Sequence, residues 1–371
     1  MKALLLIAGT ILGWNCCGDI VNAALKSPFW QGDTVHGESL LFVKAGDGPA
    51  TAKCLFTPDT IIELKSTSKN IVYVPGKDYQ LQAGSNTIIL PAGSRIDSLR
   101  DEELFPPVGA KNCIKYKKGD KSRGVLFLRK NGFLKLQVEI TYKHHDKWSG
   151  PMPQFVGEKL PRFYAKLQKH ETARVTILGD SITAGYNASK TVNTPPFQPD
   201  WQVLWQQAMM KKFKTPIVRN GRAVPGRTSG WMLLHLDKQL ETRPDLVIVA
   251  FGMNDYNAYK NAAIFKQKIQ AIMAKFRGKQ PECEFLLISP MLGNPEWSNT
   301  PWPLAFAYLK ALRELETQGV VVADLTSLWR DMLKTKSYVS QTGNGVNHPN
   351  DFGHRIYAKY LLEMFISRNK E

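Results

Sequence analysis

A serine and a histidine stand at positions where they could carry out nucleophilic chemistry. Ser181 follows an apolar run and lies within the sequence Gly179-Asp180-Ser181-Ile182-Thr183-Ala184-Gly185. A serine placed directly after a buried strand can be an exposed nucleophile, and its own N–H can help to hold an oxyanion. His348 precedes the last helical pattern of the chain and is a candidate general base. These two residue types predict acyl transfer through a serine.

Two other segments place hydrogen-bond donors at predicted strand ends. Gly226 lies in the loop 220–229, where a glycine lets a backbone N–H approach a ligand that a side chain would block. Asn254 lies in Gly252-Met253-Asn254-Asp255, directly after another apolar run, and carries an amide donor. Both segments could therefore contact the same ligand as Ser181.

The second half of the chain has the pattern of a doubly wound α/β domain. Continuous apolar runs, typical of parallel strands buried on both faces, occur at 175–178, 246–250, 285–288 and 320–323, with a weaker one near 216–218. Helical patterns lie between them at 200–213, 261–278, 302–317 and 352–367. Ligands bind such sheets at the carboxyl ends of the strands, which is where the candidate residues stand.

The first half of the chain, about residues 30–145, consists of short apolar or β-branched runs separated by turn signals. This spacing predicts an antiparallel β-sandwich, like a jelly roll, and strands are expected at 40–43, 61–64, 71–74, 87–90, 126–128 and 134–140. Glycine and proline gather between the halves. We therefore expect a signal peptide at 1–24, a β-sandwich domain at 25–148, a linker at 149–170 and the α/β domain at 171–371.

Four sequence blocks together resemble the SGNH, or GDSL, hydrolases, over roughly residues 172–368. The blocks are Gly179-Asp180-Ser181, Gly226, Gly252-Met253-Asn254-Asp255 and His348-Pro349. The resemblance implies a flavodoxin-like three-layer domain with a parallel sheet. It also implies that Ser181 is the nucleophile and His348 the base, with the N–H groups of Ser181 and Gly226 and the amide of Asn254 forming the oxyanion hole. The resemblance implies no metal and no organic cofactor.

The chain departs from the family pattern at one position. The family usually has Asp three residues before the catalytic histidine, and here that residue is Gly345. A backbone carbonyl could orient His348 in a Ser–His dyad, another acid such as Asp351 or Asp255 could substitute, or the site could be weakened. We favour the dyad, because it resembles the arrangement of some carbohydrate esterases of this superfamily. A dyad can still catalyse, since the orienting carboxylate sets the tautomer and does not itself take the proton.

Other polar residues are interpreted as structural. His354 lies six residues after His348, which is not one helical face, so we assign it no catalytic role. His144 and His145 would point to opposite faces of a strand, and we reject a metal site there. Asn187-Ala188-Ser189 fits the glycosylation acceptor pattern, to which we attach no function.

The N-terminus predicts the compartment. Lys2 is followed by a 12-residue apolar run and then by small residues near Ala24, the pattern of a cleaved secretory signal. We expect a secreted or periplasmic protein without stable membrane insertion. Lipidation at Cys16 is the alternative, and Trp14-Asn15 before it disfavours that alternative because a lipidation site would have small residues there. Cys54, Cys113 and Cys283 would remain after cleavage. Cys54 and Cys113 could pair, and we prefer the alternative of three buried free thiols.

Composition narrows the partner. The 371 residues include 49 Lys and Arg against 32 Asp and Glu, a formal charge of +17 that would concentrate an anionic polymer near the site. The family resemblance implies an O-acetyl esterase acting on acetylated polysaccharide, with an anionic substrate one option. The alternatives are another SGNH lipase, thioesterase or peptidoglycan deacetylase, or a catalytically weakened glycan-binding protein. A nucleic-acid partner is not expected, since no recognisable nucleic-acid motif accompanies the charge.

Overall fold

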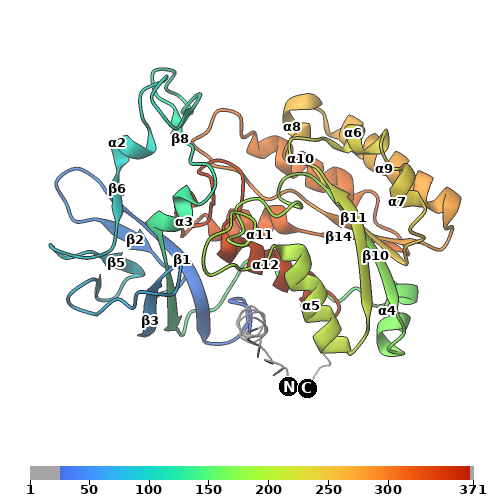
Figure 1. Ribbon diagram of the computed structural model, residues 1–371, viewed down its shortest axis with the longest axis horizontal. Helices are drawn as coiled ribbons and strands as arrows, with labels where there is room; N and C mark the ends of the chain where they lie inside the picture. Colours follow the sequence, from blue (N-terminus) through green and yellow to red (C-terminus); the bar gives the residue numbers. More distant parts are fainter. Residues whose placement is uncertain (1–25, 368–371) are drawn as a thin grey trace, which may run out of the picture.

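The computed structural model describes residues 26–367 and shows an N-terminal β region beside an α/β domain (Figure 1). The predicted signal peptide at 1–24, with its lipoprotein alternative, lies outside the described residues. Within the described residues no helix combines the length and the apolar character needed to cross a membrane. Cys54, Cys113 and Cys283 are free thiols; Cys54 and Cys283 are buried as expected, whereas Cys113 is only half-buried.

The α/β domain is built on five parallel strands. In spatial order they are β11 (Ile217–Ala223), β10 (Ala173–Gly179), β12 (Leu246–Ala250), β13 (Glu284–Ile288) and β14 (Val320–Ala323). The strand order changes direction at β10, because β11 lies on one side of β10 and the later strands lie on the other. The predicted doubly wound parallel sheet is confirmed, and this switch point is where such sheets bind ligands.

Burial explains which strands the sequence predicts clearly. The side chains of β10, β12 and β13 are almost all buried, which requires the continuous apolar runs. The edge strand β11 is largely accessible and carries Arg219 and Asn220, so its apolar signal is weak.

Helices cover both faces of this sheet (Figure 1). The long ones are α5 (Trp201–Phe213), α9 (Ala262–Lys279), α10 (Trp302–Arg313), α11 (Leu325–Met332) and α12 (Asp351–Glu363). Three short ones are α6 (Ser229–Leu233), α7 (Asp237–Leu240) and α8 (Asp255–Ala258), and a 3₁₀ turn covers Tyr338–Ser340. Asp200, Asn261 and Asn350 cap α5, α9 and α12, because their side chains accept backbone N–H groups of the first turn.

The expected linker contains a helix that the sequence analysis did not predict. Helix α4 (Pro161–Gln168) begins with proline at its first turn and buries Phe163 and Leu167. The Glu284 carboxylate of β13 accepts the N–H groups of Arg162 and Phe163 at distances of 3.1 and 2.9 Å. The start of α4 is therefore fixed to the sheet.

The N-terminal region is an antiparallel sheet region, as predicted. Its strands are β1 (Thr34–Lys44), β2 (Thr51–Lys53), β3 (Thr60–Ser66), β4 (Gln80–Leu81), β5 (Thr87–Ile89), β6 (Ser98–Arg100) and β9 (Gln137–Lys143), and only the β1–β6 pair is parallel. The long strand β1 joins two groups, because residues 34–41 pair with β9 and residues 42–44 pair with β2 and β6. A separate hairpin contains β7 (Cys113–Ile114) and β8 (Val125–Leu126), and α2 covers Asp101–Leu104.

Two predicted strands in this region are wrong. Residues 71–74 form no strand, and the exposure of Val72 and Val74 shows that their β-branched side chains do not serve a core. The expected strand 134–140 starts late, because residues 132–136 form the short helix α3, which buries Phe133 and Leu134. Periodicity alone could not separate this helical turn from the strand that follows it.

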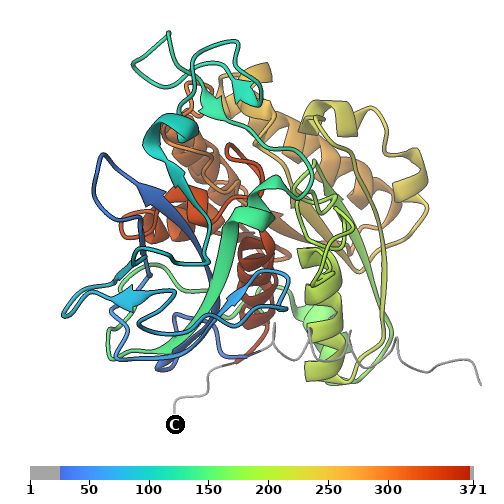
Figure 2. The same cartoon turned by 60° about the vertical axis from the view of Figure 1, so that its left-hand side comes forward.

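The two regions meet along α12, which lies between the N-terminal sheet and α5 (Figure 2). Arg355 of α12 donates to Glu139 of β9 at 3.2 Å and to Gln198 at 2.6 Å. Lys336 forms an ion pair with Glu38 of β1, and both side chains are fully buried. Breaking such a buried pair leaves an uncompensated charge, so these contacts hold the two regions together.

Candidate active site

Ser181 lies at the switch point of the sheet. Strand β10 ends at Gly179, and Ser181 follows two residues later with 5% of its surface exposed. Residues 181–187 form consecutive turns rather than a regular helix. Gly185 and Asn187 have φ angles of +80° and +65°, which a right-handed helix cannot include.

His348 faces the nucleophile directly. Its Nε2 lies 2.9 Å from Ser181 Oγ, within the reach required of a general base. The loop that carries it is organised by Asn344, whose side-chain oxygen accepts the N–H groups of Val346, Asn347 and His348 at 3.0 to 3.2 Å. The geometry is that of a serine nucleophile with its base.

The group on the other side of His348 is an amide. His348 Nδ1 lies 2.8 Å from Asn187 Oδ1. Neither candidate acid takes this place: Asp351 Oδ1 accepts the N–H of Ser189 at 2.8 Å, and Asp255 Oδ1 accepts the N–H of Ser229 at 3.0 Å. Nor is the partner a backbone carbonyl, as the dyad interpretation supposed.

Asn187 is the residue that the sequence analysis missed. Its Nδ2 donates to the carbonyl oxygens of Lys130 and Gly343, each at 2.8 Å, and its side chain is buried. The sequence signal was an asparagine two residues after a glycine in the nucleophile loop, since Asn tolerates the left-handed conformation that turns this side chain inward.

The two candidate oxyanion donors, Gly226 and Asn254, lie on the loops that follow the neighbouring strands. Gly226 follows β11 with a φ of +72°, and a Cβ on it would meet nothing within 4 Å, so conformation rather than crowding favours glycine there. Asn254 follows β12, and its Nδ2 donates to the Arg227 carbonyl at 3.0 Å. One amide hydrogen of Asn254 is thereby fixed, and the second is left for a ligand.

Burial determines the ionisation of the site. It lowers the pKa of His348 to about 3, so the imidazole is neutral and can accept a proton at neutral pH. Burial also raises the pKa of Asp180 to about 7 and that of Asp255 to about 6. At a pH between 6 and 7 the carboxyl groups of Asp180 and Asp255 are thus partly protonated, whereas the imidazole of His348 is neutral.

Other polar and aromatic residues occupy the positions of packing side chains. His354 is fully buried in α12, and its Nε2 lies 3.2 Å from the Tyr186 carbonyl oxygen. Trp201 and Trp205 are fully buried core residues, whereas Trp231 is only half-buried. In the described part of the chain no cluster of three or more His, Cys, Asp or Glu side chains could hold a metal ion.

Comparison with protein families identifies the domain that holds this site. Residues 177–356 match the GDSL-like lipase/acylhydrolase family, and the match includes Ser181, Asn254 and His348. The chain carries a GDSL-like lipase/acylhydrolase domain. Comparison with curated proteins finds no match.

Solved structures resemble the GDSL domain at low sequence identity. A two-domain esterase active on acetylated mannans is 17% identical, covers 60% of this chain and 57% of its own, and has a TM-score of 0.45. An acetylxylan esterase from Geobacillus stearothermophilus is 15% identical and covers 53% of this chain and 97% of its own, with a TM-score of 0.42. A lipase/acylhydrolase from Enterococcus faecalis is 20% identical and covers 52% and 94%, with a TM-score of 0.42.

Proposed function

We propose that this protein is a secreted or periplasmic serine esterase that removes O-acetyl groups from polysaccharide. The observation that carries the proposed chemistry is the 2.9 Å contact between Ser181 Oγ and His348 Nε2 at the switch point of a GDSL domain. The segment 1–24, with its signal-peptide pattern, supports export from the cytoplasm.

The proposed mechanism uses the chain's own groups alone. His348 Nε2 takes the proton of Ser181 Oγ as that oxygen attacks the acyl carbon. The N–H groups of Ser181 and Gly226 and the second amide hydrogen of Asn254 stabilise the oxyanion. The imidazolium then returns the proton to the leaving sugar hydroxyl, and water hydrolyses the acyl-enzyme by the same steps.

One feature beside the proposed base favours a sugar substrate. Tyr186 is 42% exposed, and its ring centroid lies 5.5 Å from that of His348. An exposed aromatic ring beside the base offers a surface on which a sugar ring can pack.

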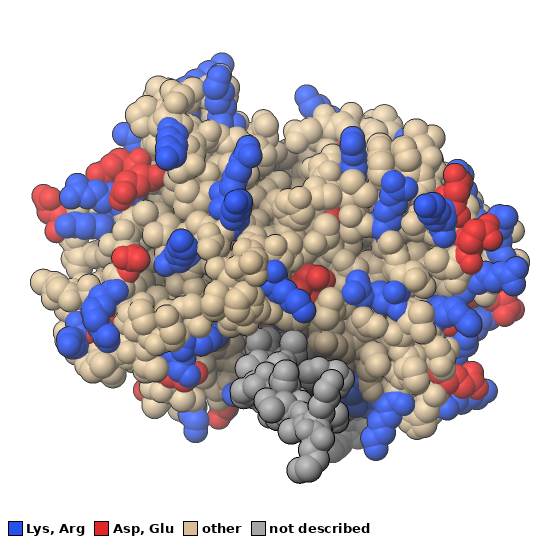
Figure 3. Space-filling view, viewed as in Figure 1, with Lys and Arg blue, Asp and Glu red and all other residues tan. Residues whose placement is uncertain are grey.

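Charge around the site favours an anionic polymer. Arg227 is exposed, its guanidinium lies 5.1 Å from the Trp231 ring, and its carbonyl holds the Asn254 amide. Lys130 is also exposed, and its carbonyl holds Asn187. Figure 3 shows Lys and Arg side chains spread over this face and on both sides of the hollow at its upper edge. Such a field would attract uronic acid or sulfated chains.

Acetate release from a panel of acetylated polysaccharides tests the proposal. Wild type, Ser181→Ala and, as a control, Ser122→Ala on an exposed loop of the N-terminal region would be compared. Release by wild type and the control, with none from Ser181→Ala, supports the esterase. If the panel gives no release, p-nitrophenyl esters of rising chain length follow, and a preference for long chains would replace the acetylesterase by a lipase. Sugar binding without any ester cleavage would favour the glycan-binding alternative.

A further inference from the structure

We propose that Asn187 is the third member of the catalytic group, a neutral amide that holds His348 in the tautomer able to activate Ser181, and that the N-terminal region keeps this amide in place. The inference rests on the proposed roles of Ser181 and His348. Asn187 acts through the imidazole and is therefore a positioning residue.

The hydrogen bonds of Asn187 fix which end of its amide faces the histidine. Both hydrogens of Nδ2 are used, one by the Lys130 carbonyl and one by the Gly343 carbonyl, each at 2.8 Å. The reverse orientation would place the amide oxygen against two carbonyl oxygens, where it could accept nothing. Oδ1 must therefore face His348 Nδ1, which lies 2.8 Å away.

The orientation of the amide in turn fixes the proton on the imidazole. An amide oxygen can only accept, so Nδ1 of His348 must carry the hydrogen. A neutral imidazole protonated on Nδ1 has an unprotonated Nε2, and this is the nitrogen that lies 2.9 Å from Ser181 Oγ. The chain of contacts from Lys130 to Ser181 therefore selects the tautomer that can accept the serine proton.

The position of Asn187 is tightly determined. Its backbone is left-handed, with a φ of +65°, and its side chain is 4% exposed. Gly343 packs against it so closely that a Cβ on Gly343 would lie 2.3 Å from the Asn187 Cβ. An amide held by two bonds and close packing can orient a base without the charge of a carboxylate.

The N-terminal region supplies one of the two carbonyls and also holds the histidine loop. Lys130 and Asn131 precede α3, and Asn131 Nδ2 donates to Thr194 Oγ1 at 3.0 Å. The N–H of Leu128 donates to the Asn344 carbonyl at 3.2 Å. These contacts make the N-terminal region part of the catalytic site rather than an appendage.

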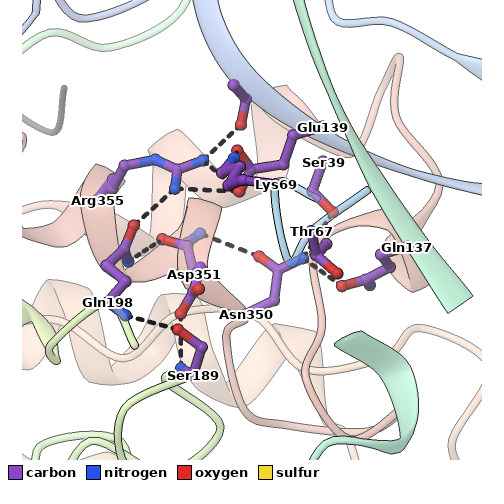
Figure 4. Close-up of polar contacts among 12 residues, drawn as sticks. Ser39, Thr67, Lys69, Gln137, Glu139, Ser189, Gln198, Asn350, Asp351 and Arg355 are labelled. Atoms are coloured by element: carbon purple, nitrogen blue, oxygen red, sulfur yellow. Dashed lines mark hydrogen bonds and ion pairs between the residues drawn. The ribbon is translucent and has the colours of Figure 1, made fainter. Parts of the chain in front are cut away.

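The opposite end of the histidine loop is held by the same region, as Figure 4 shows. Asn350, which caps α12, donates through Nδ2 to Ser39 Oγ of β1 and to Gln137 Oε1 of β9, each at 2.9 Å. Arg355 binds Glu139 one helical turn further along. The loop of His348 is thus fixed to the N-terminal sheet immediately after the histidine.

Nitrogen NMR of the imidazole tests the tautomer without any substrate. In wild type labelled with ¹⁵N-histidine, His348, assigned by comparison with His348→Gln, should show a protonated Nδ1 and an unprotonated Nε2 at neutral pH. In Asn187→Ala the two tautomers should mix. A wild-type imidazole protonated on Nε2 would overturn the proposal, and so would an Asn187→Ala imidazole with unchanged tautomer. The wild-type spectrum decides the matter even if the variant does not fold.

Reactivity of the serine provides the functional test. Labelling of Ser181 by a fluorophosphonate should slow by roughly 10²-fold in Asn187→Ala, less than the ~3 × 10⁴ lost when a serine protease loses its orienting carboxylate. With an ester that the enzyme hydrolyses, kcat of Asn187→Ala should fall while KM stays nearly constant. Asn86→Ala is the matched control, because it also removes an asparagine amide that donates to a backbone carbonyl, that of Cys54 at 2.7 Å, without touching His348. Equal losses in both variants would show that Asn187 acts only through stability.

The labelling experiment separates this inference from the proposed substrate. Slow labelling of Asn187→Ala in a protein that releases no acetate would retain the role of Asn187 and discard the acetylated polymer. Normal labelling of Asn187→Ala in an active acetylesterase would retain the polymer and discard the role of Asn187.

Discussion

A Cβ on Gly345 would lie 2.1 Å from the carbonyl oxygen of Leu126, and the backbone of Gly345 has a φ of +94°. Gly345 occupies the position, three residues before the histidine, where the resemblance to the SGNH hydrolases implies an aspartate. Leu126 belongs to β8 of the N-terminal region. The N-terminal region therefore fills the space of the usual orienting side chain, and the acceptor for His348 comes from the nucleophile loop instead.

Restoring an aspartate at this position should therefore harm the protein. Gly345→Asp must adopt an unfavourable backbone conformation and displace the Leu126 carbonyl, which together cost about 2–5 kcal/mol of unfolding free energy. We expect thermal and urea unfolding to show this loss, and Gly345→Ala to show a similar one. Gly226→Ala is the control for φ alone, because a Cβ there meets nothing within 4 Å. A stable Gly345→Asp with higher esterase activity would contradict this account.

The sequence predicts the catalytic residues that stand next to regular elements. Ser181 and Asn254 each follow a buried strand, and His348 precedes a helix, so the topology of a parallel sheet brings them together. The group that orients His348 was not predictable in the same way. Its identity depends on the left-handed backbone of Asn187 and on a carbonyl of Lys130, which is 57 residues away in the chain.

The same distinction explains the outcome for the fold. The parallel strands were predictable because burial on both faces forces continuous apolar runs. In the N-terminal region most strands are short, such as β4 with two residues and β5 with three, and short elements carry little periodicity. Helix α4 was not predicted because glycines and prolines surround it in the sequence. Its stability comes from burying Phe163 and Leu167 against the domain.

The pH dependence of the reaction should reflect the half-buried, amide-paired histidine His348. Only the neutral imidazole accepts the serine proton, so activity is present above the pKa of His348 and falls as pH drops through it. Burial lowers this pKa to about 3 from an ordinary value of 6.5, so kcat/KM should persist well below pH 6. Stability should decline as pH falls below about 6.5, since the unfolded chain then binds a proton that the folded chain does not.

Asn187→Asp should shift this profile in a known direction. A carboxylate beside Nδ1 favours the imidazolium and raises the pKa of His348, so the acid limb of kcat/KM should move to higher pH. The second carboxylate oxygen would face the carbonyls of Lys130 and Gly343 without a donor, at a cost of about 1–3 kcal/mol in stability. Asp180→Asn removes the nearby carboxyl group, whose pKa is about 7, and shows how much its ionisation contributes to the pH profile of kcat/KM. An unmoved limb in Asn187→Asp would mean that residue 187 does not face the base.

Loss of the Asn254 amide should slow catalysis without changing substrate affinity much. Asn254→Ala removes a donor that acts on the oxyanion, so kcat should fall by roughly 10²–10³ with little change in KM. Asn257→Ala, an exposed substitution in helix α8, which begins directly after Asn254, is the control. Steady-state kinetics on the best ester would check this. A wild-type rate in Asn254→Ala would remove Asn254 from the oxyanion hole.

Gln137 should link stability and catalysis. Its Nε2 donates to the carbonyls of Val339 and Thr342 at 2.7 and 2.8 Å, and its Oε1 accepts from Asn350. Gln137→Leu keeps the size but leaves the buried carbonyls of Val339 and Thr342 unpaired and removes one acceptor of Asn350, which should cost about 2 kcal/mol or more. Because these groups belong to the loop of His348, kcat should fall as well at temperatures where the protein is folded. Full activity of the folded variant would show that the loop does not need the N-terminal sheet.

Arg227 should distinguish charged from neutral polymers. Its exposed guanidinium stands on the loop of Gly226, with its own carbonyl fixing Asn254. Arg227→Gln keeps the backbone contact and removes the charge, so KM for an acetylated uronic acid polymer should rise several-fold while KM for acetylated mannan or xylan stays constant. The wild-type KM for the acidic polymer should rise with salt, because screening shortens the reach of the charge to about 8 Å at 0.15 M. Lys212→Gln, an exposed change in α5, controls for net charge. Equal effects of Arg227→Gln on acidic and neutral polymers, or a KM that ignores salt, would show that the positive charge serves no anionic substrate at this site.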